Sequence, residues 1–268
     1  MFVVINAMAE ILALRPSRQF AREQTYPAWL WPNLLALDAP IVALVWQDYL
    51  ARHFALTLHP AGRAVLALTV WAIYLLDHLV DVRHPVPESE RPRHDFCRRH
   101  IREIAAILPL ILGVDFLVAC SWVRPTVFEY GFFVSVGVVI YFAAFPLRRF
   151  GHAAWKKPVA GFLFTAGIFL VAWVSSSNPW NTLGWSAIAF FGLCLANLLM
   201  VESWEQGRES KYTWIVMAIL SICCLRWFWP AAMSAGALAI LSLGASRIST
   251  QARCVLADAV LLSPLLFR

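Results

Sequence analysis

The sequence predicts an all-α polytopic membrane protein, a bundle of about nine transmembrane helices. The first observation is composition: the 268 residues are 60% hydrophobic and 14% charged, whereas a soluble domain carries about 25% charged residues. The second is arrangement, because the charged residues gather in connectors between long apolar runs. A hydrocarbon core of about 30 Å needs about 20 apolar residues per helix. Lipid is therefore the expected solvent for most of the chain.

The apolar runs divide the chain into two parts. Residues 1–33 are expected to form an N-terminal cytoplasmic or interfacial segment, and residues 34–268 a single transmembrane domain. Within that domain, the runs between charged or Pro/Gly connectors predict spans at 34–51, 62–82, 101–123, 126–147, 158–176, 182–202, 212–227, 229–246 and 253–267.

The basic residues predict the orientation. Nine spans place 17 of the 22 Lys and Arg residues on the side that holds the N-terminus, and the positive-inside rule makes that side cytoplasmic. The net charge of +6 could also suggest nucleic acid, but basic connectors are expected to face anionic head groups or an anionic substrate. We therefore predict no nucleic-acid partner, contact with membrane lipid, and residence in a bacterial inner membrane.

An acidic pair lies at the end of the second predicted span. Asp77 and Asp81 are four residues apart, so a helix places them on one face, one turn apart. Carboxylates near lipid are costly, and Mg²⁺ is a hard cation that one or two carboxylates hold together with waters and phosphates. The alternative is that both aspartates pair with a nearby cation such as Arg83 or His84.

A second acidic cluster lies at the end of the sixth predicted span. Glu202, Glu205 and Glu209 share one face if the helix continues. By the parity of the spans this cluster emerges on the same side as the aspartates, where two carboxylate groups could clamp a diphosphate through Mg²⁺. The alternative is a solvated helix end in which Glu205 and Glu209 pair with Arg208.

Four motifs together resemble the UbiA-type intramembrane prenyltransferase superfamily over about residues 36–267. The motifs are Leu-Asp-Ala-Pro-Ile at 37–41, Asp-His-Leu-Val-Asp at 77–81 followed by Glu-Arg-Pro at 90–92, Tyr-Phe-Ala-Ala-Phe-Pro-Leu-Arg-Arg at 141–149, and Met-Val-Glu-Ser-Trp-Glu-Gln-Gly-Arg-Glu-Ser at 200–210. The resemblance implies a helical bundle around a central cavity that opens toward the cytoplasmic leaflet. It also implies that Mg²⁺ and two acidic motifs bind an isoprenyl diphosphate, from which pyrophosphate leaves and an allylic cation is passed to an acceptor.

Carried over residue by residue, the resemblance assigns the metal and the catalysis to four carboxylates: Asp77, Asp81, Glu202 and Glu205. It implies a substrate-binding set made of Arg83, Arg91, Tyr141, Arg148, Arg149, Lys156 and Lys157, to which we add the Asn197 amide as an oxygen ligand one turn above the second motif. Aromatic faces can stabilise the cation, and Trp71, Tyr74, Tyr141 and Phe145 are candidates.

This chain departs from the family pattern at three positions. Ile73 stands where the first motif begins with Asn, and Trp204 and Gln206 replace acidic residues of the second motif. The expected function is Mg²⁺-dependent transfer of an isoprenyl group from a prenyl diphosphate to a lipophilic, membrane-associated and aromatic acceptor. The alternatives are a UbiA-like terpene cyclase, an isoprenoid-binding protein without activity, or a secondary transporter. Asp258, in the last apolar run, is expected to pair with a basic or polar group and to be structural.

Overall fold

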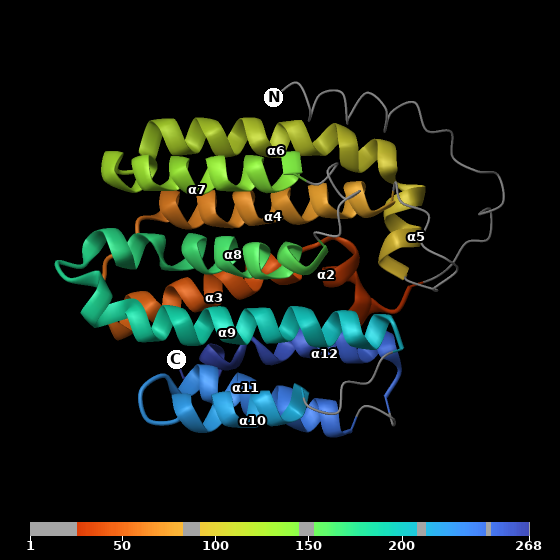
Figure 1. The fold of residues 1–268 in the computed structure, drawn as a ribbon. Helices are drawn as coiled ribbons and strands as arrows, with labels where there is room; N and C mark the ends of the chain where they lie inside the picture. Colours follow the sequence, from red (N-terminus) through yellow and green to blue (C-terminus); the bar gives the residue numbers. More distant parts are fainter. Residues whose placement is uncertain (1–25, 83–91, 145–152, 208–212, 245–247, 268) are drawn as a thin grey trace.

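The computed structural model describes residues 26–82, 92–144, 153–207, 213–244 and 248–267, and over these ranges the chain is helical with no strand. The helices lie side by side (Figure 1), so the predicted all-α class is confirmed. In chain order they are η2 (Ala28–Leu30), α2 (Trp31–Leu34), α3 (Asp38–His53), α4 (Pro60–Val82), α5 (Pro92–Arg99), α6 (Ile101–Trp122), α7 (Pro125–Ala144), α8 (Ala153–Ser175), α9 (Pro179–Glu205), α10 (Thr213–Cys224), α11 (Trp229–Leu243), α12 (Thr250–Val260) and η5 (Ser263–Phe267).

Five of the described helices are long and apolar enough to cross a membrane: α4, α6, α7, α8 and α9. A sixth span results if Ala28–Leu34 and Asp38–His53, which are bent by 83° at the break between them, count as one. Each of the nine predicted spans overlaps a helix, but α10 and α11 are shorter apolar helices of 12 and 15 residues. A helix of 12 residues rises only about 18 Å, so the count of nine stays a prediction.

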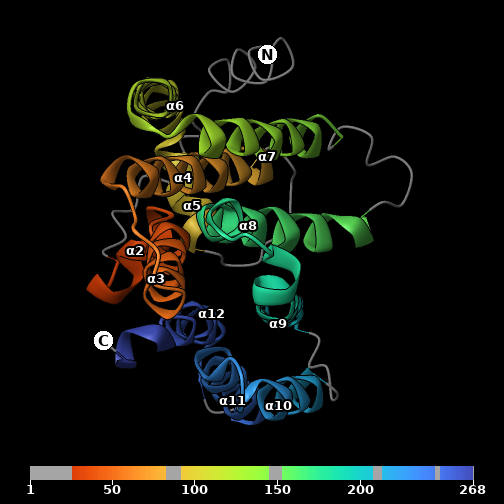
Figure 2. The same ribbon diagram turned by 90° about the vertical axis from the view of Figure 1, so that its left-hand side faces the viewer.

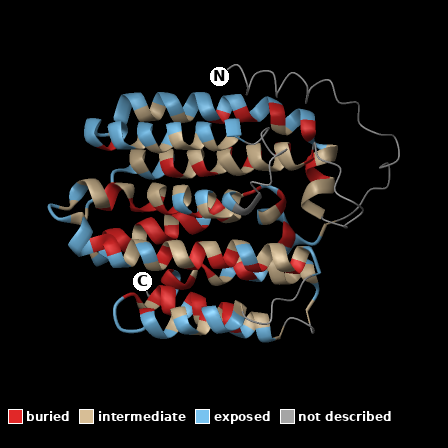
Figure 3. Ribbon diagram, viewed as in Figure 1, coloured by how far each residue is buried: buried red, intermediate tan, exposed pale blue. Residues whose placement is uncertain are grey.

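The outer surface of the bundle is apolar, as an integral membrane protein requires. Leu110 on α6 is 68% exposed and Ile222 on α10 is 74% exposed, and exposed positions cover much of α6, α7 and α10 (Figure 3). Trp122, Trp180 and Trp227, each about two-thirds exposed or more, lie at or beside helix ends at one end of the bundle, and Trp155 lies near the helix end at the other. Interfacial tryptophans of this kind mark the two edges of a membrane-spanning region.

A left-handed turn joins α2 to α3. The amide of Leu37 donates to the Pro32 carbonyl (2.8 Å), the amide of Ala36 donates to the Asn33 carbonyl (3.2 Å), and Ala36 has a φ of 55°. This is the Schellman arrangement that ends a helix. It turns the chain so that Asn33 Nδ2 donates to Asp38 Oδ2 at the start of α3 (2.9 Å).

Five helices form a closed ring. In the order α3, α4, α8, α9 and α12, each helix contacts the next, and α12 returns to contact α3. Figure 2 shows this ring end-on, with α6 and α7 beyond α4 and α8 on one side and α10 and α11 beyond α9 and α12 on the other.

Trp46 on α3 forms the buried centre of this packing. Its side chain is completely buried, its ring lies 4.6 Å from Phe190 and 5.4 Å from Phe228 between centroids, and its Nε1 donates to the Leu261 carbonyl at 2.7 Å. A buried indole needs such a partner, so this bond ties the first helix of the ring to the end of the last.

Candidate functional site

A cavity of about 410 Å³ lies among the ring helices, with α5 and α7 contributing to its walls. The ends of α4 and α9 lie on the same side of the molecule, at the right of Figure 1. The charged side chains of both ends line the cavity there, whereas residues farther along the helices, such as Leu66 on α4 and Gly167 on α8, make its apolar part. The cavity therefore joins a charged end to an apolar interior.

The acidic pair of α4 is held by one lysine of α8. Lys156 Nζ lies 3.2 Å from Asp77 Oδ1 and 3.4 Å from Asp81 Oδ1. The three side chains are between 24% and 31% exposed, so water reaches them only in part. Since Asp77 and Asp81 are one turn apart, a single ammonium group bridges both carboxylates and offsets their repulsion.

Lys157, the next residue of α8, pairs with the acidic end of α9. Lys157 Nζ forms an ion pair with Glu202 Oε2 on α9. Neighbouring residues of a helix point about 100° apart, and α8 packs against both α4 and α9, so consecutive lysines reach opposite walls. The two carboxylate groups, which are more than 120 residues apart in the chain, therefore lie on one cavity and are linked through α8.

Arg93 on the short helix α5 completes the charged end. Its Nη2 lies 2.7 Å from Glu205 Oε1, and it lines the same cavity. Burial disfavours its charged form, but the attraction of Glu205, Asp81 and Asp77 outweighs burial and raises the pKa of Arg93. The guanidinium therefore stays charged, and with the two lysines it gives the cavity three cations facing four carboxylates.

A second polar group lies on the α3, α9 and α12 walls. Asp38 accepts from the Asn33 amide group and from its neighbour's backbone amide (both 2.9 Å). Asn197 Nδ2 donates to Asp258 Oδ1 (3.2 Å), which confirms the expected polar partner of Asp258. The Asp38 and Asp258 side chains both line the cavity.

Aromatic side chains line the interior next to the acidic pair. Tyr74, one turn before Asp77, lines the cavity together with Tyr141, Phe142 and Phe164. The rings of Tyr74 and Phe164 meet edge-on at 6.4 Å. Trp71, another predicted aromatic candidate, is not among the lining residues, and its Nε1 donates to the Leu35 carbonyl (2.9 Å).

All the predicted metal-binding and substrate-binding residues that fall in the described ranges line this one cavity. They are Asp77, Asp81, Tyr141, Lys156, Lys157, Asn197, Glu202 and Glu205. The predicted substrate-binding residues Arg83, Arg91, Arg148 and Arg149 and the aromatic candidate Phe145 lie outside the described residues.

Two cavity residues escaped the sequence analysis. Arg93 directly follows the Arg-Pro dipeptide at 91–92, and the positive-inside rule alone accounts for a basic residue in such a connector. Asp38 lies inside the motif at 37–41. The sign in the sequence that could have identified it is an acidic residue at the start of an apolar run.

The four carboxylates supply oxygen donors of the kind that Mg²⁺ prefers. Over the residues that the structure describes, no three Asp, Glu, His or Cys side chains are grouped closely enough to hold a metal ion. The pairs on α4 and α9 instead offer two hard oxygen groups each. Mg²⁺ is commonly bound through one or two carboxylates, with waters and substrate phosphates completing its octahedron. The donor set therefore suits Mg²⁺ that arrives with a phosphate-bearing ligand.

No family model, curated protein or solved structure matches this chain. The resemblance to the UbiA-type superfamily therefore depends on the four motifs, and the geometry of the cavity is the independent observation beside them. That geometry brings the two acidic motifs and the lysines that follow the third motif to a single site.

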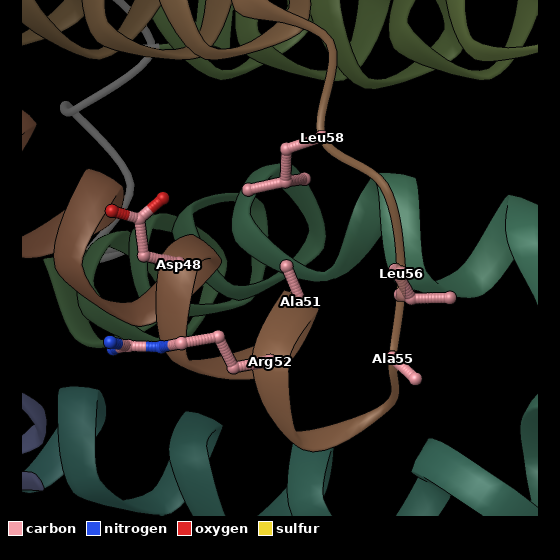
Figure 4. A pocket seen from close by; sticks show the side chains of 6 residues that line it. All are labelled: Asp48, Ala51, Arg52, Ala55, Leu56 and Leu58. Atoms are coloured by element: carbon pink, nitrogen blue, oxygen red, sulfur yellow. The ribbon is translucent and has the colours of Figure 1, made fainter. Parts of the chain in front are cut away.

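A second recess lies at the far end of α3, around the turn into α4 (Figure 4). It holds about 500 Å³ and is lined by Asp48, Ala51, Arg52, Ala55, Leu56 and Leu58. Asp48 is already paired with Arg63 at 3.0 Å. The recess is open to the surface and contains one acid and one base, so it lacks the grouped charges of the ring cavity.

Proposed function

We propose that the protein is an integral membrane enzyme that transfers an isoprenyl group from a prenyl diphosphate to a lipophilic acceptor in a Mg²⁺-dependent reaction. The supporting observation is the juxtaposition of two acidic pairs, two lysines and an arginine at one end of an apolar cavity. A prenyl diphosphate has the same two parts, a polyanionic head and an apolar tail. The positive-inside pattern supports a cytoplasmic location for the charged end. The proposal includes a bundle of nine spans and residence in a bacterial inner membrane.

The cations of the site are suited to the diphosphate. Lys156, Lys157 and Arg93 each form an ion pair with a carboxylate. A diphosphate carries several charged oxygens, and Lys and Arg form charge-assisted hydrogen bonds with phosphate as they do with carboxylate, so we expect these side chains to turn from the acids to the diphosphate on binding. They then stabilise the charge that develops on the leaving pyrophosphate.

Asp77, Asp81, Glu202 and Glu205 are the residues that would hold Mg²⁺ once the lysines are released from them. The metal would supply further neutralisation of the diphosphate. The aromatic lining would have a separate role: Tyr74, Tyr141 and Phe164 line the interior of the cavity, and a ring face can stabilise an allylic cation.

One observation favours the second candidate, an isoprenoid-binding protein without transfer activity. The ammonium of Lys156 already bridges Asp77 and Asp81, which is the position that a divalent cation would take. A protein that binds a prenyl diphosphate through lysines alone would not need Mg²⁺.

The test is pyrophosphate release by the purified protein from radiolabelled farnesyl and geranylgeranyl diphosphates, with Mg²⁺ or with EDTA, in the presence of a membrane extract. We expect Mg²⁺-dependent release and a prenylated product identified by mass. Asp77→Asn and Glu202→Gln should each lower the rate by at least ~10²-fold, as loss of a charge-stabilising group does. Asp48→Asn, at the far end of α3, is the matched control.

Wild-type rates in both site variants would refute the proposed site. Donor binding without pyrophosphate release would identify the binding protein instead. Release of pyrophosphate with a cyclised donor and no acceptor product would identify a cyclase.

A further inference from the structure

The recess at the far end of α3 has no part in the proposed transfer reaction. It lies at the opposite end of the bundle from the charged end of the ring cavity, where α3 turns into α4. Ala51 and Arg52 of α3 line one side, and Ala55, Leu56 and Leu58 of the following turn line the other (Figure 4). Most of this lining is apolar, so it favours a ligand that brings apolar surface with it.

The turn that forms the apolar side is fixed by its own backbone. The amide of Leu56 donates to the Ala51 carbonyl (2.7 Å), and the amide of Ala55 donates to the Arg52 carbonyl (3.3 Å). With the φ of 51° at Ala55, this is a second Schellman arrangement. Because backbone amides already satisfy these two carbonyls, the Arg52 guanidinium is not required as their cap.

The recess carries positive charge that no carboxylate offsets. Asp48, its one acidic residue, lies 3.0 Å from Arg63 Nη2 and is therefore paired. Arg52 is exposed, and its side chain forms no ion pair or hydrogen bond with the residues that the structure describes. Arg124 Nη2, from the turn between α6 and α7, donates to the backbone carbonyl of Thr57 (3.2 Å), which lies in the turn that lines the recess. Two guanidinium groups thus remain for an anion.

The recess also lies at the level of a membrane surface. Trp122, Trp180 and Trp227 lie at or beside helix ends at this end of the bundle, and interfacial tryptophans mark the head-group region. With nine spans, this side holds the five Lys and Arg residues that remain of 22, and three of the five are the arginines just described. The positive-inside rule does not account for arginines on this side, so their grouping at one recess needs another explanation.

We propose that this recess binds the head group of an anionic phospholipid. Arg52 pairs with the phosphodiester, because its planar guanidinium matches two phosphate oxygens at once. Leu56 and Leu58 contact the glycerol and the first methylene groups of the acyl chains. A zwitterionic lipid carries its own cation beside the phosphate, which competes with Arg52, so the site prefers a lipid with net negative charge.

The experiment measures lipid binding to the full-length protein in detergent by native mass spectrometry. The protein is titrated with phosphatidylglycerol or with phosphatidylcholine of the same acyl chains, and occupancy by the first lipid gives a Kd. Arg52→Gln removes the charge, and Leu58→Asp puts an acid on the apolar side. Arg226→Gln is the matched control, because Arg226 is an exposed arginine in the turn between α10 and α11, outside the recess. Inorganic phosphate is the competitor that tests for a free anion.

We expect the wild type to bind phosphatidylglycerol at least ~5-fold more tightly than phosphatidylcholine, as one hydrogen bond to a charged group implies. Arg52→Gln should remove this preference, and Leu58→Asp should weaken phosphatidylglycerol binding by repulsion. Arg52→Lys should keep part of the preference because it retains the charge without the planar fork. Arg226→Gln should bind as the wild type does, and millimolar inorganic phosphate should not displace the lipid.

Equal affinity of the wild type for the two lipids would overturn the proposal, and so would a preference that Arg52→Gln retains. An equal loss in Arg226→Gln would show general attraction to a basic surface and would also overturn it. Displacement of the lipid by inorganic phosphate would identify a site for the free anion instead. If Leu58→Asp fails to fold, Arg52→Gln still decides, because the Arg52 side chain is exposed.

Discussion

Replacing Lys156 by methionine tests the link between α4 and α8. Met has nearly the same length and volume but no charge, so the substitution leaves Asp77 and Asp81 one turn apart without the ammonium group that lies 3.2 and 3.4 Å from them. Their mutual repulsion then opposes folding. The destabilisation should therefore come from the charges and not from lost packing.

The exposure of the three side chains determines how much stability the substitution should remove. An exposed ion pair contributes about 0–1 kcal/mol, whereas removal of one partner from a fully buried pair costs about 3–5 kcal/mol. Because the side chains of Lys156, Asp77 and Asp81 are 24% to 31% exposed, we expect the free energy of unfolding to fall by about 2 kcal/mol.

The assay is reversible unfolding in mixed detergent micelles with increasing SDS, followed by tryptophan fluorescence. Lys157→Met is the matched control: it removes one contact, to Glu202, whose side chain is 40% exposed, so its effect should be smaller. Adding Asp81→Asn to Lys156→Met should restore part of the lost stability because it removes one of the two repelling charges. Two results together would refute this account. The free energy of unfolding of Lys156→Met would lie within 0.5 kcal/mol of the wild-type value, about the noise of such comparisons, and the double variant would show no recovery.

Two further predictions concern other parts of the fold. Ala55 follows α3, is exposed and has a φ of 51°. Ala55→Gly should therefore raise the free energy of unfolding by about 0.5–1 kcal/mol in the same SDS assay, whereas Ala51→Gly inside the helix should lower it by about 1 kcal/mol. A loss of stability in Ala55→Gly would contradict backbone strain at this position. Cys97 on α5 is 1% exposed, and burial raises the pKa of its thiol to about 12. It should therefore resist modification by a water-soluble maleimide at pH 8 until the protein is unfolded. Rapid modification of the folded protein, measured by mass spectrometry, would contradict its burial.

The sequence predicted the long helices well, because the length and hydropathy of a run are local properties. Apolar runs between charged connectors located every long helix, and the four-residue spacing of Asp77 and Asp81 was enough to place them on one face. The pairing of Lys156 and Lys157 with different helices was not predictable. It depends on α8 lying between α4 and α9, which no local pattern in the sequence encodes.

Asp38 and Asp258, which line the same cavity, show this limit more clearly. Asp38 and Asp258 are separated by 220 residues, and each alone reads as an isolated acid at the edge of an apolar run. Only the closure of the ring brings them together. Arg93 was missed for a different reason: a basic residue in a connector satisfies the positive-inside rule, and composition gives no sign that α5 directs it back toward Glu205.

The order in which the ring helices are synthesised has a consequence for biogenesis. Contacts between α3 and α12 close the ring, yet α12 is the last of the five to leave the ribosome. Until it inserts, Asn197 lacks the carboxylate of Asp258, and the indole of Trp46 lacks the carbonyl of Leu261. An arrested nascent chain should therefore be a substrate for membrane quality-control proteases, and a separately synthesised C-terminal helix should rescue it in trans.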